Sequence, residues 1–538
     1  MTTPAVVATS DRRRWLALIA IAVSVLIVGL DLTVLSLALP TLSRDLHAST
    51  SDLQWFSDAY SLVIAAVVLP AGLLGDRLGR KKVLLVALVL FGASSAFCAL
   101  ATSSGELIAA RALLGLGAAA IMPLSLSVLP VLFTPEERPK AIAIMASATF
   151  ISFPVGPLLG GWLLDNFWWG SVFLINVPIV VLALIAVAFL MPESRGQQRA
   201  RLDAIGVVIS GLGLTALTYG FIKAGESGWG DATSLATILA GVVLLVAFVG
   251  WERRVRAGRG QPLVELSLFS SAGFTWGTIL STLVSFALFG ILFATPLYFQ
   301  DVRGLDALGS GVRLLPLIGG MVVGMVGGSR LQNPRKGPEG QLMAPPVTAK
   351  ALVTVGYLVM AIGLAVGTLT KASSGTGFTA IWFAVTGLGL GIAMPTAMNA
   401  AIGALSVERS GAGTALITAM RQVGATIGVA VLGTVINDAY RNQLHLGRLS
   451  ASAASAVRAS VGTGVEAAKA AHSIPLLDMV HDAFVHGMGI MLWVCAGIAL
   501  ASALLALFFL PRRAGQAGPP TEAALVPSDE AARAELGR

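Results

Sequence analysis

Three ionisable residues lie inside long apolar stretches in the first quarter of this chain. Asp31 is in a stretch from Trp15 to about Leu39, Asp58 is early in the next stretch, and Arg111 is in the fourth. An ionisable group within an apolar span is costly to desolvate, so it indicates a function by default. A carboxyl that is buried in one state and meets water in another can load and release a proton. We therefore expect Asp31 to couple a reaction to proton movement, with Asp58 and Arg111 as its neighbours.

Each of these residues also has a structural explanation. Asp31 could be a satisfied acid between packed helices, and Asp58, near the start of its span, could cap a helix N-terminus. Arg421, in a later apolar stretch, is either a further functional candidate or a side chain that snorkels to the inner interface. These alternatives stay open at the level of sequence.

The sequence lacks the motifs that an enzyme or an ATP-driven pump needs. No Gly-Lys-Ser or Gly-Lys-Thr phosphate-binding element occurs. The histidines fall outside the apolar stretches, and Cys98 and Cys495 fall within them, where small buried thiols are expected. Gly228–Asp231 reads GWGD but lies in an expected outer loop without a second acidic span. We expect no catalytic residue, no metal, no cofactor and no ATP, and an ion gradient as the source of energy.

Composition indicates an integral membrane protein. The 538 residues are 56% hydrophobic and only 12% charged, whereas about 25% is usual for a soluble domain. The net charge of +8 comes from cations in loops beside apolar spans, as the positive-inside rule requires, so nucleic acid is not an expected partner. Membrane lipid is.

The apolar stretches predict the number and direction of the spans. Stretches of about 18 to 25 residues are long enough to cross a bilayer. Roughly fourteen occur, starting near residues 15, 54, 83, 106, 140, 170, 204, 233, 273, 310, 351, 378, 411 and 484. An even number places both termini on one side, and the Lys/Arg-rich loops make that side the cytoplasm of a cell (plasma) membrane.

A short charged segment between the second and third stretches is expected to be a hinge. Gly72–Lys82 reads GLLGDRLGRKK, with four cations that favour the cytoplasmic side. Its glycines permit a tight turn, and its acid can pair with a nearby cation. We expect a role in conformational gating for Gly72, Asp76, Arg77, Gly79 and Arg80.

A second glycine-rich element lies in the fifth stretch, where Pro154–Gly161 reads PVGPLLGG. Prolines remove backbone hydrogen bonds, and glycines at helical spacing let a partner helix approach closely. This pattern predicts a bend and a seal, or else a simple packing face. The gating residues that we expect here are Gly156, Pro157, Gly160 and Gly161.

The chain also repeats itself. Gly115–Pro123 reads GLGAAAIMP and Gly387–Pro395 reads GLGLGIAMP, 272 residues later, and each is followed by a Glu-Arg pair, Glu137-Arg138 and Glu408-Arg409. Such a repeat predicts two halves related by duplication, with a substrate site at their interface near the midplane. Two six-helix bundles with two extra central helices would account for the offset.

Together these segments resemble the signatures of the fourteen-helix drug:proton antiporters of the major facilitator superfamily. The first span adds LDLTVLSLALP from Leu30 to Pro40, and the fourth adds Arg111 before its glycines. The resemblance covers most of the chain and is strongest in residues 15–180. One departure is clear: the family usually has Trp-Arg-Trp before Phe-x-x-Asn-x-Pro, whereas Trp168-Trp169-Gly170-Ser171 precedes Phe173 here.

The resemblance implies an all-α polytopic membrane protein with the major facilitator fold. It implies a proton-coupled antiporter that exports a hydrophobic aromatic drug or antibiotic and confers resistance, similar to self-resistance exporters of the tetracenomycin type. A proton-coupled importer of the same superfamily and a non-transporting membrane sensor are the alternatives. The expected domains are a cytoplasmic tail (1–14), the first bundle (15–195), two linker helices (196–260), the second bundle (261–511) with a long outer loop (437–482), and a cytoplasmic tail (512–538).

Charge bears on the substrate, whose binding residues the sequence does not identify. Within or close to the spans are two acids, Asp31 and Asp58, against Arg111, Arg313 and Arg421. A dication would find too little negative charge to replace its water. A small drug molecule that is aromatic and neutral or weakly acidic is therefore expected.

Overall fold

The computed structural model describes residues 11–134, 137–195, 203–258, 262–332, 347–405, 410–446 and 449–511. In these ranges every regular element is a helix, and fourteen helices are long and apolar enough to cross a membrane. The expected tail of residues 512–538, most of the N-terminal tail and the Glu408-Arg409 pair lie outside the described residues. The fold is thus an all-α polytopic membrane protein, as the sequence predicts.

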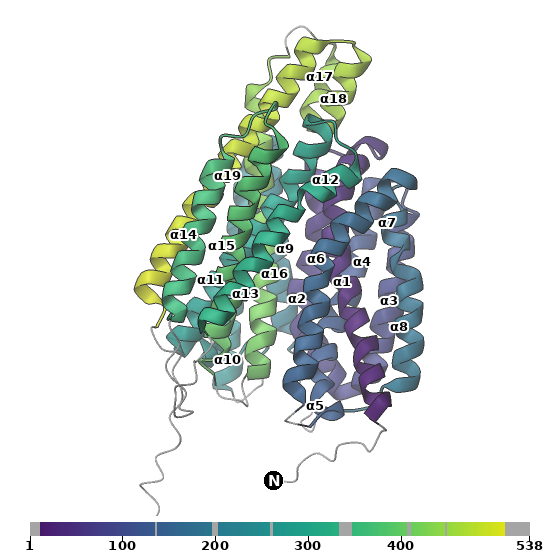
Figure 1. The fold of residues 1–538 in the computed structure, drawn as a ribbon, viewed down its shortest axis with the longest axis vertical. Coiled ribbons are helices and arrows are strands. Elements are labelled where there is room, and N and C mark those ends of the chain that lie inside the picture. Colours follow the sequence, from purple (N-terminus) through teal and green to yellow (C-terminus); the bar gives the residue numbers. More distant parts are fainter. Residues whose placement is uncertain are drawn as a thin grey trace, which may run out of the picture.

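The first half is a bundle of six long helices. They are α1 (Asp11–Asp45), α2 (Thr50–Leu78), α3 (Arg80–Ala99), α4 (Ser104–Ser127), α6 (Arg138–Asn166) and α8 (Asn176–Leu190), with the short α5 (Leu129–Leu132) and α7 (Ser171–Leu174) between them. Figure 1 shows these purple and blue helices beside the green and yellow helices of the second half.

Two further helices connect the halves. These are α9 (Ala204–Ser227) and α10 (Ala232–Ala257), which pack on each other, and α9 also packs against α2 and α16. The second half has six long helices as well: α11 (Ala272–Leu297), α13 (Leu315–Gln332), α14 (Ala349–Gly367), α15 (Thr376–Ile402), α16 (Ser410–Gln443) and α19 (Ile474–Phe509). Its short elements are η1 (Leu266–Ser270), the π-helical η2 (Tyr298–Val302), α12 (Ala307–Arg313), α17 (Ala451–Ala459) and α18 (Val461–Ala470).

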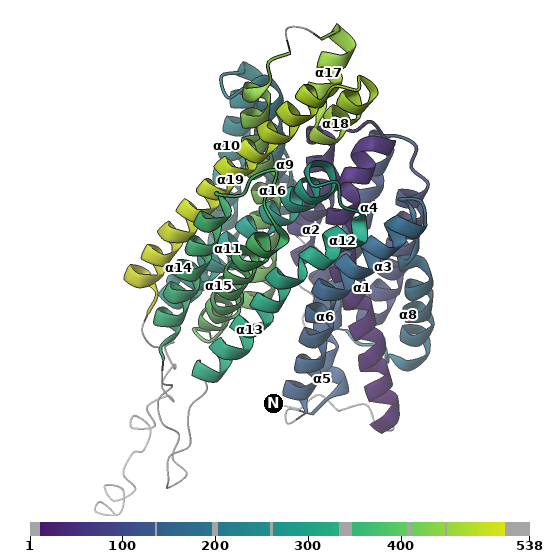
Figure 2. The ribbon, with the colours of Figure 1, turned by 45° about the horizontal axis from the view of Figure 1, so that its top comes forward.

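Two ends of the molecule can be distinguished. Figures 1 and 2 both place α17 and α18 at one end, which we call the outer end. In Figure 1 α1 begins and α19 ends at the opposite, inner end. The first and last described helices therefore share a side, as an even number of spans requires.

The predicted hinge between α2 and α3 is shorter than the charged segment Gly72–Lys82. Because α2 continues to Leu78 and α3 begins at Arg80, only Gly79 separates the two helices. Its φ of 117° is one that side chains rarely adopt, which explains the glycine. The charged segment is therefore mostly helical.

The expected outer loop of residues 437–482 needs a larger correction. Within it α16 continues to Gln443, α17 and α18 form two short helices, and α19 begins at Ile474 rather than near residue 484. The side chains of Ser450, Ser460 and Ser473 accept hydrogen bonds at the three helix N-termini. N-terminal capping stabilises such short helices, and a search for apolar runs does not detect it.

The glycines of the internal repeat make equivalent contacts in both halves. In α4, Gly115 lies against the backbone of Tyr60 in α2, and Gly117 lies against α3. In α15, Gly387 lies against the backbone of Leu317 in α13, and Gly389 lies against α14. In each half the first glycine contacts the helix two spans earlier and the second contacts the preceding span. The packing confirms the repeat.

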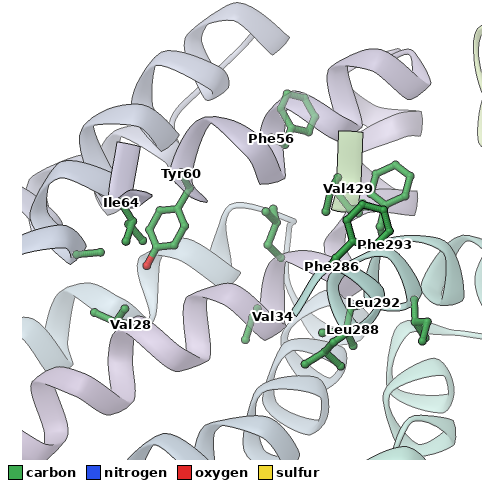
Figure 3. Packing of buried hydrophobic residues seen from close by; sticks show 14 of the residues in the cluster. Val28, Val34, Phe56, Tyr60, Ile64, Phe286, Leu288, Leu292, Phe293 and Val429 are labelled. Carbon is green, nitrogen blue, oxygen red and sulfur yellow. The ribbon is translucent and has the colours of Figure 1, made fainter. Parts of the chain in front are cut away.

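The halves meet along α2 and α16 and along α1 and α11. Figure 3 shows part of this apolar packing, with Val34 of α1, Phe293 of α11 and Val429 of α16 in one cluster. Several polar contacts between the two bundles lie toward the outer end. Such contacts connect Ser43 to Ser460, Leu37 to Gln300, Gln54 to α16 and Asp165 to α12.

Candidate transport site

A buried ion pair joins α1 and α4 in the first half. Arg111 Nη1 donates a hydrogen bond to Asp31 Oδ2 at 2.5 Å, and both side chains are 1% exposed. Two charges removed from water are stable only when their geometry is close and their remaining donors are satisfied. The structure thus brings together two of the three residues that the sequence singled out.

Other groups hold the guanidinium of Arg111 in place. Its Nε donates to the backbone oxygen of Phe56 at 2.9 Å. The ring of Tyr60 lies 4.4 Å from its central carbon, and that of Phe173 lies 5.9 Å away. A cation over an aromatic face is stabilised by the negative potential of the ring. Sequence reasoning missed these partners, although Phe56 and Tyr60 are four residues apart and share a helix face.

Asp58 makes no hydrogen bond with this pair. It is fully buried, and neither carboxyl oxygen has a hydrogen-bond partner among the described residues. One turn toward the outer end, Gln54 donates to the backbone oxygens of Val429 and Ala430. Residues four apart lie on one helix face, so Asp58 shares the face of α2 that carries Gln54. Asp58 is also not a helix cap, because Ser49 and Asp52 cap α2.

A narrow pocket lies between the halves beside the ion pair. It is lined from the first half by Ser36, Ser61 and Arg111, among others, and from the second by Phe289 and Phe293. About 10 Å³ is open to the centre of a water molecule, which is about enough for one water. A drug-sized ligand needs about 300 Å³ or more. The halves must therefore separate here before such a molecule can bind.

A larger groove of about 610 Å³ lies elsewhere, at the inner end of α10 beside η1. It is lined by Arg253, Arg256 and Phe269, among others, and it is open to solvent. None of its lining residues belongs to the ion pair or to the first half, so the narrow pocket is the better candidate for the transport site.

The predicted gating segment is tied to the end of α8. Asp76 forms an ion pair with Arg80 at 2.9 Å. The backbone N–H of Arg80 donates to Ser194, and that of Lys81 donates to Glu193. Gly72 packs near Pro123, and Arg77 has no ion pair among the described residues. The segment therefore clamps α2, α3 and the chain after α8 within one half.

The glycine-rich element of α6 makes close contacts on two sides. Gly156 and Gly160 lie against Thr33 and Val34 of α1. A Cβ on Gly161 would come within 2.6 Å of the Leu308 Cα, in the other half. The backbone of Pro157 likewise lies against Gly311 of α12. The close helix approach expected from the sequence is present, and it includes a contact between the halves.

Two acids at the outer end were missed by sequence reasoning. Asp165 accepts hydrogen bonds from the backbone N–H groups of Ala307 and Leu308, both at 2.9 Å. Asp301, in the π-helical turn, is buried, with Arg44 of the first half at 3.9 Å. Both follow apolar runs in segments expected to be loops, and nothing in the local sequence shows that they contact the other half.

Two repeated helical bundles around a shared interface are the architecture of a secondary transporter. Comparison with known proteins agrees with this architecture, because residues 21–429 match the Major Facilitator Superfamily. The chain belongs to that superfamily and is a multi-pass membrane transporter.

Its relatives include resistance and efflux proteins. The chain is 34% identical to the tetracenomycin C resistance and export protein of Streptomyces glaucescens, over 92% of this chain and 91% of that protein. It is 32% identical to the multidrug efflux pump LfrA of Mycolicibacterium smegmatis, over 91% of this chain and 95% of that protein. A bacterial homologue of the human lysosomal transporter Spinster, in an inward-facing and unoccupied conformation, has a similar fold, with a TM-score of 0.67 and 17% identity over 95% of this chain and all of that one.

Proposed function

We propose that this protein exports a hydrophobic aromatic drug or antibiotic across the cell membrane in exchange for protons, and so confers resistance. Both termini are cytoplasmic in this proposal, and α17 and α18 face outward. One relative is named for resistance to and export of tetracenomycin C, and the other is named as a multidrug efflux pump. These names support export over import. Neither name says what drives transport.

The observation that carries the proposal is the buried Asp31–Arg111 ion pair beside the pocket between the halves. A proton on Asp31 would remove one charge and leave the other without a counter-ion. Loss of one partner of a buried pair is strongly unfavourable, by about 3–5 kcal/mol. Protonation would thus weaken the link between α1 and α4, and deprotonation would restore it. This alternation can bias a two-state transporter.

Asp58 has a separate role in this scheme. It is buried on the face of α2 that carries Gln54, whose side chain donates to backbone oxygens of α16, where the halves must separate. Its unpartnered carboxyl can hold a proton while the halves are together and lose it when water enters. The proton-coupling residues are therefore Asp31, Asp58 and Arg111. The segments that contain Asp76 and Gly161 are the conformational gates in this proposal.

The test uses inverted membrane vesicles that carry a pH difference and a hydroxyanthraquinone as probe. Wild-type protein should accumulate the probe against its gradient and discharge the pH difference. Asp31→Asn preserves shape but cannot titrate, so it should abolish both effects at an unchanged protein level. Asp45→Asn is the matched control, because Asp45 lies on the same helix but is exposed.

The alternatives give different results in the same vesicles. An importer would move the probe in the same direction as protons. A sensor would move no probe, with or without a gradient. Uphill accumulation that persists in Asp31→Asn, together with discharge of the pH difference, would place the proton site elsewhere.

A further inference from the structure

The second half contains an arginine whose surroundings differ sharply from those of Arg111. Arg421 lies part way along α16, half-buried, where its Nε donates to Ser285 Oγ at 3.3 Å and its Nη2 contacts Met394 Sδ at 3.9 Å. In the described ranges no carboxylate lies within 4.0 Å of this guanidinium, whereas Arg111 has Asp31 at 2.5 Å. Arg421 is thus a cation inside a span without a counter-ion.

The guanidinium of Arg421 has unused hydrogen-bonding capacity. An arginine presents five N–H donors and remains charged in proteins. One donor goes to a hydroxyl and one to a thioether sulfur, which is a weak acceptor. A charged donor set in an apolar region is costly unless an anion or water completes it. Its planar fork suits a carboxylate or another oxygen anion.

The position of Ser285 connects Arg421 to the pocket between the halves. Ser285, Phe289 and Phe293 follow one another at intervals of four in α11, so they form a stripe along one face of that helix. Phe289 and Phe293 line the pocket. Ser285 is the next residue of the stripe toward the inner end. Arg421, bonded to Ser285, therefore lies where this pocket would extend if the halves separated.

The groups around this position suit an aromatic ligand. Phe289 is partly buried, packs against the apolar core and lines the pocket, where its ring can meet a second aromatic face. The thioether of Met394 is flexible and polarizable, which suits it to contact with rings of varied shape. An aromatic surface next to an uncompensated cation can recognise a molecule that is both flat and acidic.

We propose that Arg421 binds an acidic group of the transported molecule, so that the preferred substrates are aromatic weak acids in their anionic form. This inference rests on the proposed export function and defines its substrate class. The acidic oxygen atoms accept hydrogen bonds from the free N–H groups of Arg421, and the rings lie along the stripe of Phe289 and Phe293. Arg111 cannot bind the acidic group in this way, because its guanidinium already forms an ion pair with Asp31.

The test measures binding to the purified full-length protein in detergent, without any gradient. The probes are an anthraquinone carboxylic acid and its methyl ester, which have almost the same size but differ in charge. Wild-type protein should bind the acid about tenfold more tightly, since one hydrogen bond to a charged group contributes about 1.5 kcal/mol or more. Arg421→Gln should lose this preference and keep its affinity for the ester within about twofold.

Two further variants separate recognition from folding. Arg313→Gln removes an arginine near the outer end that donates to Gly309 and Thr376, so it should keep the preference for the acid. Arg421→Lys keeps the charge without the fork and should retain part of the preference. In wild-type protein the affinity for the acid should rise as that probe ionises, whereas affinity for the ester should not change with pH.

Several outcomes overturn the inference. They are an unchanged preference in Arg421→Gln, an equal or tighter binding of the ester by wild-type protein, and binding of neither probe. Because this assay needs no proton gradient, its result does not depend on coupling. A failure of export in the vesicle assay would reject the proposed function separately.

Discussion

The carboxylate of Asp165, in α6 of the first half, accepts a hydrogen bond of 2.9 Å from the backbone N–H of Leu308, in α12 of the second half. Its other oxygen accepts from Ala307 at the same distance. The first N–H groups of a helix have no partner within that helix. An acid from the other half satisfies two of them here, while Asp306, at the start of α12, accepts from Gly309. The two halves are therefore joined at the outer end by a helix cap that one supplies to the other.

The first prediction concerns this cap. Asp165→Ala should shift the protein toward an outward-open conformation by about fivefold, because a lost cap costs about 1 kcal/mol. The measurement is labelling of Ser36→Cys, in the pocket wall, by a membrane-impermeant maleimide added outside. Both native cysteines are buried and should react slowly.

Asp231→Ala is the matched control for that experiment. Asp231 also caps a helix, accepting from Ser234 N–H at 2.9 Å, but it does so within the linker pair and not between the halves. Labelling of the Ser36→Cys site should stay at the wild-type rate. Equal acceleration in both variants would mean that cap loss loosens the protein generally.

The second prediction concerns the stability of the buried ion pair. Asp31→Leu leaves Arg111 without a counter-ion and should destabilise the protein by about 3–5 kcal/mol. The double variant Asp31→Leu/Arg111→Met removes both charges and should recover most of that loss without recovering export. The measurement is the thermal unfolding midpoint of all variants in one detergent.

Asp58→Leu is informative in the same series. Since Asp58 has no hydrogen-bond partner to lose among the described residues, this variant should unfold close to the wild-type midpoint. A midpoint for the double variant as low as that of Asp31→Leu would show that the pair is not the source of the destabilisation.

The third prediction concerns the gating segment. Asp76→Asn should impair turnover more than expression, because the Asp76–Arg80 ion pair holds the segment in the geometry that contacts the chain after α8. The pair is partly exposed, so little stability should be lost. Transport rates are compared at equal protein level in vesicles.

Glu226→Gln provides the control for a surface pair. Glu226 pairs with Lys223 at 3.0 Å within a single helix, with a similar exposure. The Glu226→Gln variant should transport at the wild-type rate. Wild-type turnover in Asp76→Asn would exclude the segment from the mechanism.

The fourth prediction concerns orientation. Lys82 is exposed at the inner end of α3, in the segment that the positive-inside rule assigns to the cytoplasm. A cysteine placed by Lys82→Cys should react with an impermeant maleimide only after the cells are permeabilised. Reaction in intact cells would reverse the topology.

Sequence alone determined the number, order and approximate limits of the spans. A peptide group is costly to desolvate unless it is hydrogen-bonded, so a segment that crosses the bilayer forms a helix. A run of about 20 apolar residues is therefore identified as a membrane helix by its length and composition. The same reasoning identified Asp31, Asp58 and Arg111, because charge within such a run is exceptional. The repeated glycines around Gly115 and Gly387 revealed the two halves, since close helix packing needs small residues at fixed spacing.

Tertiary structure alone decided which of these residues meet. Asp31 and Arg111 are 80 positions apart and form one ion pair, whereas Asp58, two residues after the Phe56 carbonyl that binds Arg111, has no hydrogen-bond partner among the described residues. Neither result can be read from apolar runs, because the rotation of each helix about its axis depends on packing against several neighbours at once. The cap from Asp165 to Leu308 and the helical form of residues 451–470 follow from the same cause. Membrane burial is encoded locally along the chain, but the partner of a buried polar group is set by contacts between distant segments.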